Sequence, residues 1–227
     1  FTSCNTAKPS KGVASPDYPR VDTLITQSLF ADRTSTISEE NIQTILDGTY
    51  TLPQQLRVAI VRLEPGPQSR RNYWNYWSDE QFLKTQQSYL DLFSQKFKES
   101  SRVTKLSIIP DLLISRSPSF TNIREAAVRM QADVVVVYSI TSDIYSRYKL
   151  FSKSDIKAFA TTQLIVLDVR TGLIPFSTTI TKDFLSQRKK EELDFAEAAS
   201  RVQNEAVLLT INDIGQQISG FLNGKSH

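Results

Sequence analysis

The chain has 227 residues, 40% of them hydrophobic and 22% charged, with a formal net charge of +3. This length and composition are typical of a globular domain with one sizeable core. The net charge is too small to indicate nucleic-acid binding, which usually requires a concentrated basic face. No uninterrupted apolar run approaches the ~20 residues needed to span a bilayer, and the glycines form no phosphate-binding motif.

Residues 1–20 are rich in Lys, Pro, Ser and Gly and are expected to form a flexible tether. Cys4, the only cysteine, lies in this tether and cannot form an internal disulfide. Phe1-Thr2-Ser3-Cys4 resembles the acceptor site of bacterial lipoproteins, in which the thiol is diacylated and the preceding residues are cleaved away. This resemblance implies that the sequence begins inside a signal peptide, and that Asn5 favours the outer membrane. The alternative is a chance cysteine in a disordered tail.

Residues 21–227 are predicted to form one mixed α/β domain. A short amphipathic segment of uncertain type at 21–31 precedes a helix that Ser38 caps and Gly48 ends. Residues 56–63 are predicted to be a strand. The next helix, at 78–99, begins with a capping box and carries apolar residues at three- and four-residue spacing, so one face is expected to be buried.

The second half of the domain is predicted to be rich in strands. A strand at 103–109 and a helix at 121–131 precede residues 133–140, whose β-branched run indicates a central strand covered on both faces. Two more strands follow at 157–169 and 174–184, joined by a turn with Gly172 at the position that favours a positive φ. A long helix at 191–221 completes the order.

This order of elements predicts the fold class. The first half alternates strands and helices and requires crossover connections, whereas the second half forms an antiparallel meander. We therefore predict an α/β fold with a single three-layer sandwich. Its mixed sheet of about five strands would have helices on both faces, including the long C-terminal helix.

Two short motifs carry a resemblance to known families, namely Ala132-Asp133-Val134 and Asp168-Val169-Arg170-Thr171-Gly172. Their order resembles the α/β sandwich of the curli-secretion lipoproteins, the lipoprotein activators of penicillin-binding proteins and the N-terminal domain of the Tol-system translocation protein. The rhombotarget lipoproteins are similar too, through "LRVAIVRLEPG" and "VLDVRTGLIPF". The resemblance covers most of residues 56–185 and implies a fold and an envelope location. It implies no catalytic or ligand residue.

Few residues suit catalysis. The only histidine is His227, which removes imidazole triads and most metal sites that need imidazole. Asp143, Asp155 and Asp168 lack the spacing of a calcium loop, and the Ser-Lys-Ser sequence at 152–154 falls in a predicted hairpin loop. We therefore predict no enzyme and no cofactor or metal.

A loop at 68–77 holds both tryptophans and supplies the candidate partner-binding residues. Trp, Tyr and Arg dominate interface hot spots, and they also stack on sugars. The candidates are Arg70, Arg71, Tyr73, Trp74 and Tyr76. The alternative is that the loop aromatics are partly buried against the fold. A second candidate, the basic and aromatic hairpin at 145–159, lacks the clean alternation of a membrane strand. It is predicted to be solvated, and the alternatives are an exposed edge or a contact with lipid headgroups.

Together these features predict a non-enzymatic, lipid-anchored protein of the outer membrane that faces the periplasm or the cell exterior. It would act as a binding or assembly module for an envelope protein or a glycan, with no nucleic-acid partner. One alternative is a regulator of a cell-wall synthesis enzyme. Another is a carboxylate-based hydrolase, which would require two buried, converging carboxylates in a cleft. The oligomeric state and the identity of the partner are left open.

Overall fold

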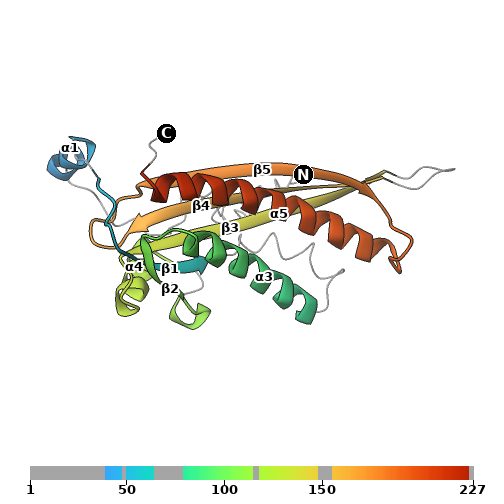
Figure 1. Ribbon diagram of the computed structural model, residues 1–227, viewed down its shortest axis with the longest axis horizontal. Helices are drawn as coiled ribbons and strands as arrows, with labels where there is room; N and C mark the ends of the chain where they lie inside the picture. The colour runs from blue at the N-terminus through green and yellow to red at the C-terminus, as the bar shows by residue number, and fades with distance from the viewer. Residues whose placement is uncertain (1–38, 48–49, 64–78, 115–117, 148–154, 225–227) are drawn as a thin grey trace, which may run out of the picture.

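The computed structural model describes residues 39–47, 50–63, 79–114, 118–147 and 155–224 (Figure 1). The helices and strands follow the predicted order, which is confirmed. They are α1 (Glu39–Asp47), β1 (Leu56–Arg62), α3 (Asp79–Lys98), β2 (Val103–Ile108), the 3-10 helix η1 (Asp111–Leu113), α4 (Phe120–Arg129), β3 (Val134–Arg147), β4 (Asp155–Asp168), β5 (Phe176–Gln187) and α5 (Phe195–Leu222).

The strands form one five-stranded mixed sheet in the order β2-β1-β3-β4-β5. β1 is parallel to both β2 and β3, and β3, β4 and β5 form an antiparallel meander. The parallel pairs are joined through α3 and α4, because parallel neighbours need a crossover between them. The run Val134–Tyr138 lies between β1 and β4 and is buried, as its continuous β-branched sequence predicted.

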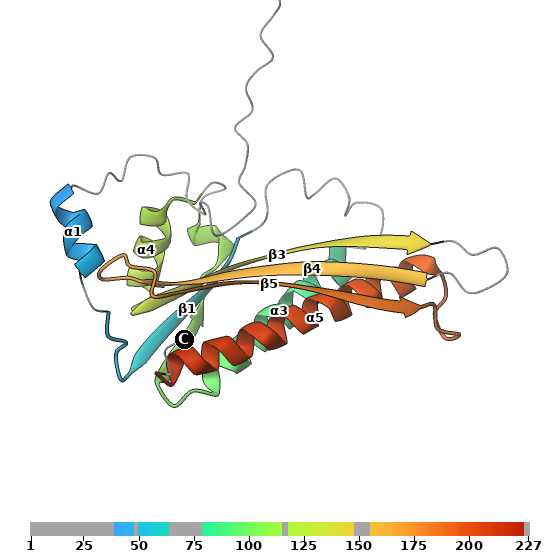
Figure 2. The ribbon, with the colours of Figure 1, turned by 90° about the horizontal axis from the view of Figure 1, so that it is seen from above.

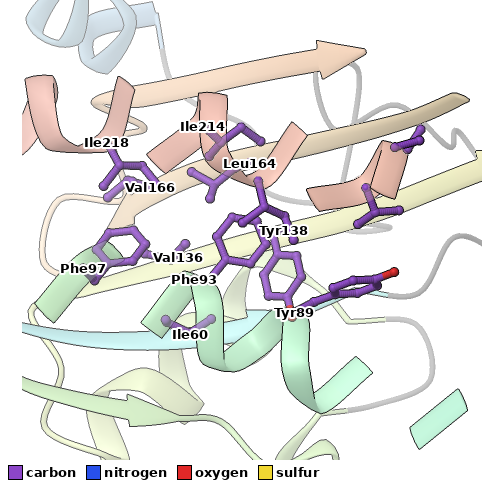
Figure 3. Packing of buried hydrophobic residues seen from close by; sticks show 14 of the residues in the cluster. Ile60, Tyr89, Phe93, Phe97, Val136, Tyr138, Leu164, Val166, Ile214 and Ile218 are labelled. Atoms are coloured by element: carbon purple, nitrogen blue, oxygen red, sulfur yellow. The ribbon is translucent and has the colours of Figure 1, made fainter. Parts of the chain in front are cut away.

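Alternate residues of the strands point to opposite faces of the sheet, and each face has its own core. On one face the sheet packs against α3 and α5, where Phe93, Tyr138, Leu164 and Ile214 point toward one another (Figure 3). On the other face α4 packs through Ile123, Ala126 and Ala127. The predicted three layers, with helices on both faces, are confirmed.

The two faces are covered to different extents. α5 follows β3, β4 and β5 along most of their length, whereas α4 lies at one end of the sheet (Figure 2). Beyond that end, the α4 side of the meander carries exposed and half-buried side chains. We call this surface the open face; its residues are Asp143, Tyr145, Lys157, Phe159, Ser177, Thr179, Thr181, Asp183, Leu185 and Gln187.

The long β3–β4 hairpin is the main departure from the prediction. Both strands have 14 residues and stay paired from Val134–Asp168 to Arg147–Asp155, whereas the predicted strands ended at residue 140 and began again at 157, with a hairpin at 145–159. The register places Ile140 and Ile144 on the α5 side, where they contact the core. The strands therefore continue because one face still buries apolar side chains, although no helix covers the other face there.

Candidate functional site

The residues predicted from the sequence to form sites lie outside the described part of the chain. These are the lipidation candidate Cys4 and the partner-binding candidates Arg70, Arg71, Tyr73, Trp74 and Tyr76. Their roles stay predictions. The described residues form two other candidate sites, namely a carboxylate cluster near the start of β3 and the open face.

The carboxylate cluster joins the two motifs that carry the family resemblance. Asp133 directly precedes β3, and its carboxylate accepts hydrogen bonds from Arg57 Nη2 at 2.7 Å and from Arg57 Nε and N, both at 3.0 Å. Arg170 lies 3.7 Å from the same carboxylate. The backbone adds a bond from Val169 N to Asp133 O at 3.0 Å. The first motif and the late turn thus form one unit that also holds β1.

Asp168, at the end of β4, organises the turn. Its Oδ1 accepts from Thr171 N at 2.7 Å and Thr171 Oγ1 at 2.8 Å, and its Oδ2 accepts from Tyr50 Oη at 3.2 Å. Gly172 has a φ of +78°, a conformation that favours glycine, and an added Cβ there would lie 3.2 Å from Phe120. This explains the D-x-x-T-G pattern as turn chemistry, as predicted for this segment.

The electrostatics of the cluster argue for a structural role. The hydrogen bonds from Arg57 hold the pKa of Asp133 below its ordinary value of 3.8. The pKa of Tyr50 is raised above its usual range, chiefly by burial and secondly by the nearby Asp168 carboxylate. A carboxyl group that serves as a general acid needs a raised pKa. Asp133 shows the opposite shift, so it does not suit the part of general acid in the hydrolase alternative.

We expect Asp133→Asn to destabilise the protein in a pH-dependent way. A depressed carboxyl pKa contributes stability at pH values above 3.8 and loses it as the pH falls through and below that value. The variant should therefore be less stable than the wild type by roughly 1–2 kcal/mol at pH 7. The difference should shrink toward zero near pH 2, measured by urea denaturation across pH.

The control for this experiment is Asp183→Asn, which removes an exposed carboxylate that pairs with Lys157 at 3.0 Å. Exposed ion pairs contribute little, so its free energy of unfolding should stay within about 0.5 kcal/mol of the wild type at pH 7. A constant difference between Asp133→Asn and the wild type from pH 7 to pH 2 would contradict the electrostatic role of Asp133.

The open face presents apolar groups to solvent. Tyr145 is 53% exposed and Leu185 is 62% exposed, and both lie opposite Lys157 of the strand between them. The Tyr145 ring stacks on Phe159 with the centroids 5.6 Å apart and the planes 4° from parallel. The stack lies beside the Lys157–Asp183 ion pair. Part of the hairpin that was predicted to be solvated therefore displays an ordered aromatic and aliphatic patch.

The sequence identified part of this patch, because the candidate hairpin at 145–159 contains Tyr145 and Phe159, but it did not place Leu185 beside them. Tyr145, Phe159 and Leu185 lie on three different strands, and only the register of the meander brings them to one face. A usable signal was the alternation of polar and apolar residues in β5. It places Phe184 on the core face of the strand and Leu185 on the other face. Among the described residues, no helix is both long and apolar enough to cross a bilayer, and no cluster of His, Cys, Asp and Glu is suited to bind a metal ion.

No protein-family model and no curated protein matches this sequence. Solved structures give partial matches. A Helicobacter pylori protein, described as a homologue of a neuraminyllactose-binding hemagglutinin, is 11% identical over 75% of this chain and 87% of its own, with a TM-score of 0.46. A hypothetical protein from Chlamydia trachomatis is 12% identical over 74% and 98%, with a TM-score of 0.41. A lipoprotein from Neisseria meningitidis is 10% identical over 70% and 99%, with a TM-score of 0.32.

These matches include bacterial lipoproteins, but likeness at this level does not assign the chain to a family or give it a function. The resemblance to curli-secretion, penicillin-binding-protein-activator, Tol and rhombotarget proteins stays a prediction from the short motifs. What the described structure adds is the explanation of those motifs as one junction of β1, β3 and β4.

Proposed function

We propose that this protein is a lipid-anchored envelope protein that binds another protein through its open face and catalyses no reaction. The anchor is Cys4, whose place in a polar, Pro- and Ser-rich segment suits acylation better than packing in a core. The observation that carries the binding role is the patch of exposed Tyr145 and Leu185 with half-buried Phe159, on a sheet whose other face packs against α3 and α5.

The chemistry of the patch favours a protein over a glycan. One face of the Tyr145 ring is already taken by its stack with Phe159, which leaves less ring surface for a sugar. Leu185 has no ring, whereas the cores of protein interfaces bury aromatic and aliphatic side chains together. Lys157 lies between Tyr145 and Leu185, and its pairing with Asp183 compensates its charge within such an interface. The loop candidates, Trp74 and Tyr76 among them, would extend this surface or form a separate one.

Site-specific photocrosslinking in intact cells tests the binding role. A photoreactive amino acid at Leu185 should give an adduct with one defined envelope protein, and the same probe at Val128 of α4, which is 58% exposed, should not. Tyr145→Ser with Leu185→Ser should lower recovery of that adduct partner about tenfold while leaving stability nearly unchanged. Comparison with Trp74→Ala and Tyr76→Ala shows whether the loop contributes.

The outcomes separate the parts of the proposal. Equal crosslinking at Leu185 and Val128 would overturn the open face as the binding surface. A cell-wall synthesis enzyme as the adduct partner would make the protein a regulator of that enzyme, whereas capture of a glycan would replace the protein partner. Mass spectrometry of the native N-terminal peptide tests the anchor independently, because an unmodified Cys4 in envelope-derived protein would remove it.

A further inference from the structure

β5 forms an edge of the sheet that lacks the usual protection against pairing. Among the described strands it pairs only with β4, and none of them pairs with its other side. Natural edges are blunted by short length, Pro, bulges or charges. β5 has 12 residues without an internal Pro or Gly, and its register against β4 is continuous from Val166–Phe176 to Asp155–Gln187. The opposite edge, β2, has only six residues and carries Lys105.

The charges of β5 do not block the edge either. Lys182 and Asp183 are its only charged residues, and each has a partner within the same chain. Lys182 Nζ lies 2.6 Å from Asp213 of α5, and Asp183 lies 3.0 Å from Lys157 of β4. Both side chains are therefore neutralised on the faces of the sheet, while the backbone groups along the edge stay available.

The sequence of β5 is self-complementary about Ile180. Phe176, Ile180 and Phe184 recur at four-residue spacing, all half-buried on the α5 side of the strand. If two β5 strands pair antiparallel around a two-fold axis at Ile180, then Ile180 faces Ile180 and Phe176 faces Phe184 of the second strand. Aromatic and β-branched pairs of this kind stabilise adjacent strands.

The same register also gives favourable pairs of residues on the open face. Thr179 lies opposite Thr181 of the second strand, and Ser177 lies opposite Asp183, so no like charges meet. An axis at Lys182 or at Asp183 would place each of these charges opposite itself, which is unfavourable. An axis that falls between two residues corresponds to a register shifted by one residue. That shift would place the α5 side of one strand on the same side of the sheet as the open face of the other.

From the unprotected edge and its self-complementary pattern, we propose that two copies of this chain associate through β5, antiparallel, about a two-fold axis at Ile180. The two sheets join into one continuous ten-stranded sheet, with both α5 helices on one side and both open faces on the other. Pairing along one edge buries less than a standard interface. The dimer is therefore weak, with a dissociation constant on the order of 10–100 µM.

Sedimentation equilibrium of the full chain at up to about 500 µM tests this association, in a Cys4→Ser background that prevents unwanted disulfides. Thr179→Lys with Thr181→Lys places lysine opposite lysine twice, and should weaken the dimer at least about tenfold. Thr179→Lys with Thr181→Glu places lysine opposite glutamate twice and should restore it. Both variants lose the Thr161–Thr181 hydroxyl contact of 2.9 Å, so the pair is matched for this change.

Disulfide crosslinking tests the register itself. A mixture of 15N-labelled Thr179→Cys with unlabelled Thr181→Cys should form a mixed disulfide, because directly opposed residues lie within disulfide range. Thr181→Cys alone should give about tenfold less covalent dimer. A monomeric wild type at about 500 µM would overturn the proposal, as would equal weakening by the two charge variants. A self-crosslink centred on Thr181 would overturn the axis at Ile180.

Discussion

Replacing Phe93 with alanine is expected to lower the free energy of unfolding by about 3–5 kcal/mol, because the large side chain leaves a cavity that neighbours fill only in part. Phe93 has no exposed surface and projects from α3 toward the sheet (Figure 3). Its ring centroid lies 4.5 Å from that of Tyr138 on β3, with the planes tilted by 43°. Urea denaturation followed by circular dichroism measures the loss.

Tyr138→Phe is the matched control on the other ring of this pair. The Tyr138 hydroxyl is buried and has no hydrogen-bond partner among the described residues, and burial raises its pKa to about 12. Removing an unsatisfied buried hydroxyl relieves its desolvation cost, so this variant should be as stable as the wild type or up to about 1 kcal/mol more stable. A cost below about 1 kcal/mol for Phe93→Ala would show that α3 is not part of the core.

The elements with strong periodicity were predicted well. The apolar spacing of the helix at 78–99 predicted one buried face, and Phe93 and Phe97 on that face are buried. The β-branched run before Ile140 identified the central strand, because only a strand covered on both faces tolerates continuous apolar residues. The fold class follows from these elements and from the crossover rule, which leaves few ways to connect them.

Contacts between distant segments could not be read from the sequence. Arg57 and Asp133 are 76 positions apart, and no local pattern signals that the start of β1 meets the residue before β3. The open face is a similar case, since it exists only through the register of three strands. The burial of a short helix was not predictable from its sequence either. The helix before Gly48 was predicted correctly and is α1, yet its apolar Ile45 is 41% exposed and Leu46 is 73% exposed.

The start of the last helix was predicted four residues too early, at residue 191. The structure begins α5 at Phe195, after Asp194 accepts a hydrogen bond from Glu197 N at 2.8 Å. Glu197 in turn accepts from Leu193 N at 2.7 Å. Asp194 is therefore the N-cap, while Glu197 reaches back to the N–H of Leu193, one residue before the cap; the D-x-x-E pattern was present in the sequence. Leu193, which the predicted helix at 191–221 includes, is 88% exposed.

The segment before α5 is instead organised by Glu192, a buried carboxylate. It accepts hydrogen bonds from Lys189 N at 2.6 Å and from the Arg201 guanidinium of α5. Arg201 also donates to Gln187 O at 3.0 Å, at the end of β5. The bond from Arg201 holds the pKa of Glu192 below its ordinary value, so the pair is ionised at neutral pH.

Replacing Glu192 with alanine should therefore lower the free energy of unfolding by roughly 2–4 kcal/mol, because it leaves the Arg201 guanidinium largely buried without a counter-charge. Glu192→Gln keeps an acceptor and should cost less. The double variant Glu192→Ala with Arg201→Ala should recover part of the loss, since no uncompensated charge remains. A double variant whose cost equals the sum of the two single costs would contradict the coupling.

Glu192→Ala should loosen the junction of β5 and α5 more than the rest of the molecule. Arg201 connects the end of β5 to the first turns of α5, so hydrogen exchange should accelerate for the amides of Ala198–Val202 and stay unchanged in β1. The part of the β3–β4–β5 meander that lies beyond α4 has a helix on only one face, and that helix is α5. Glu192 and Arg201 join the end of β5 to the first turns of α5, so this pair also supports one end of the continuous edge on which the proposed association depends.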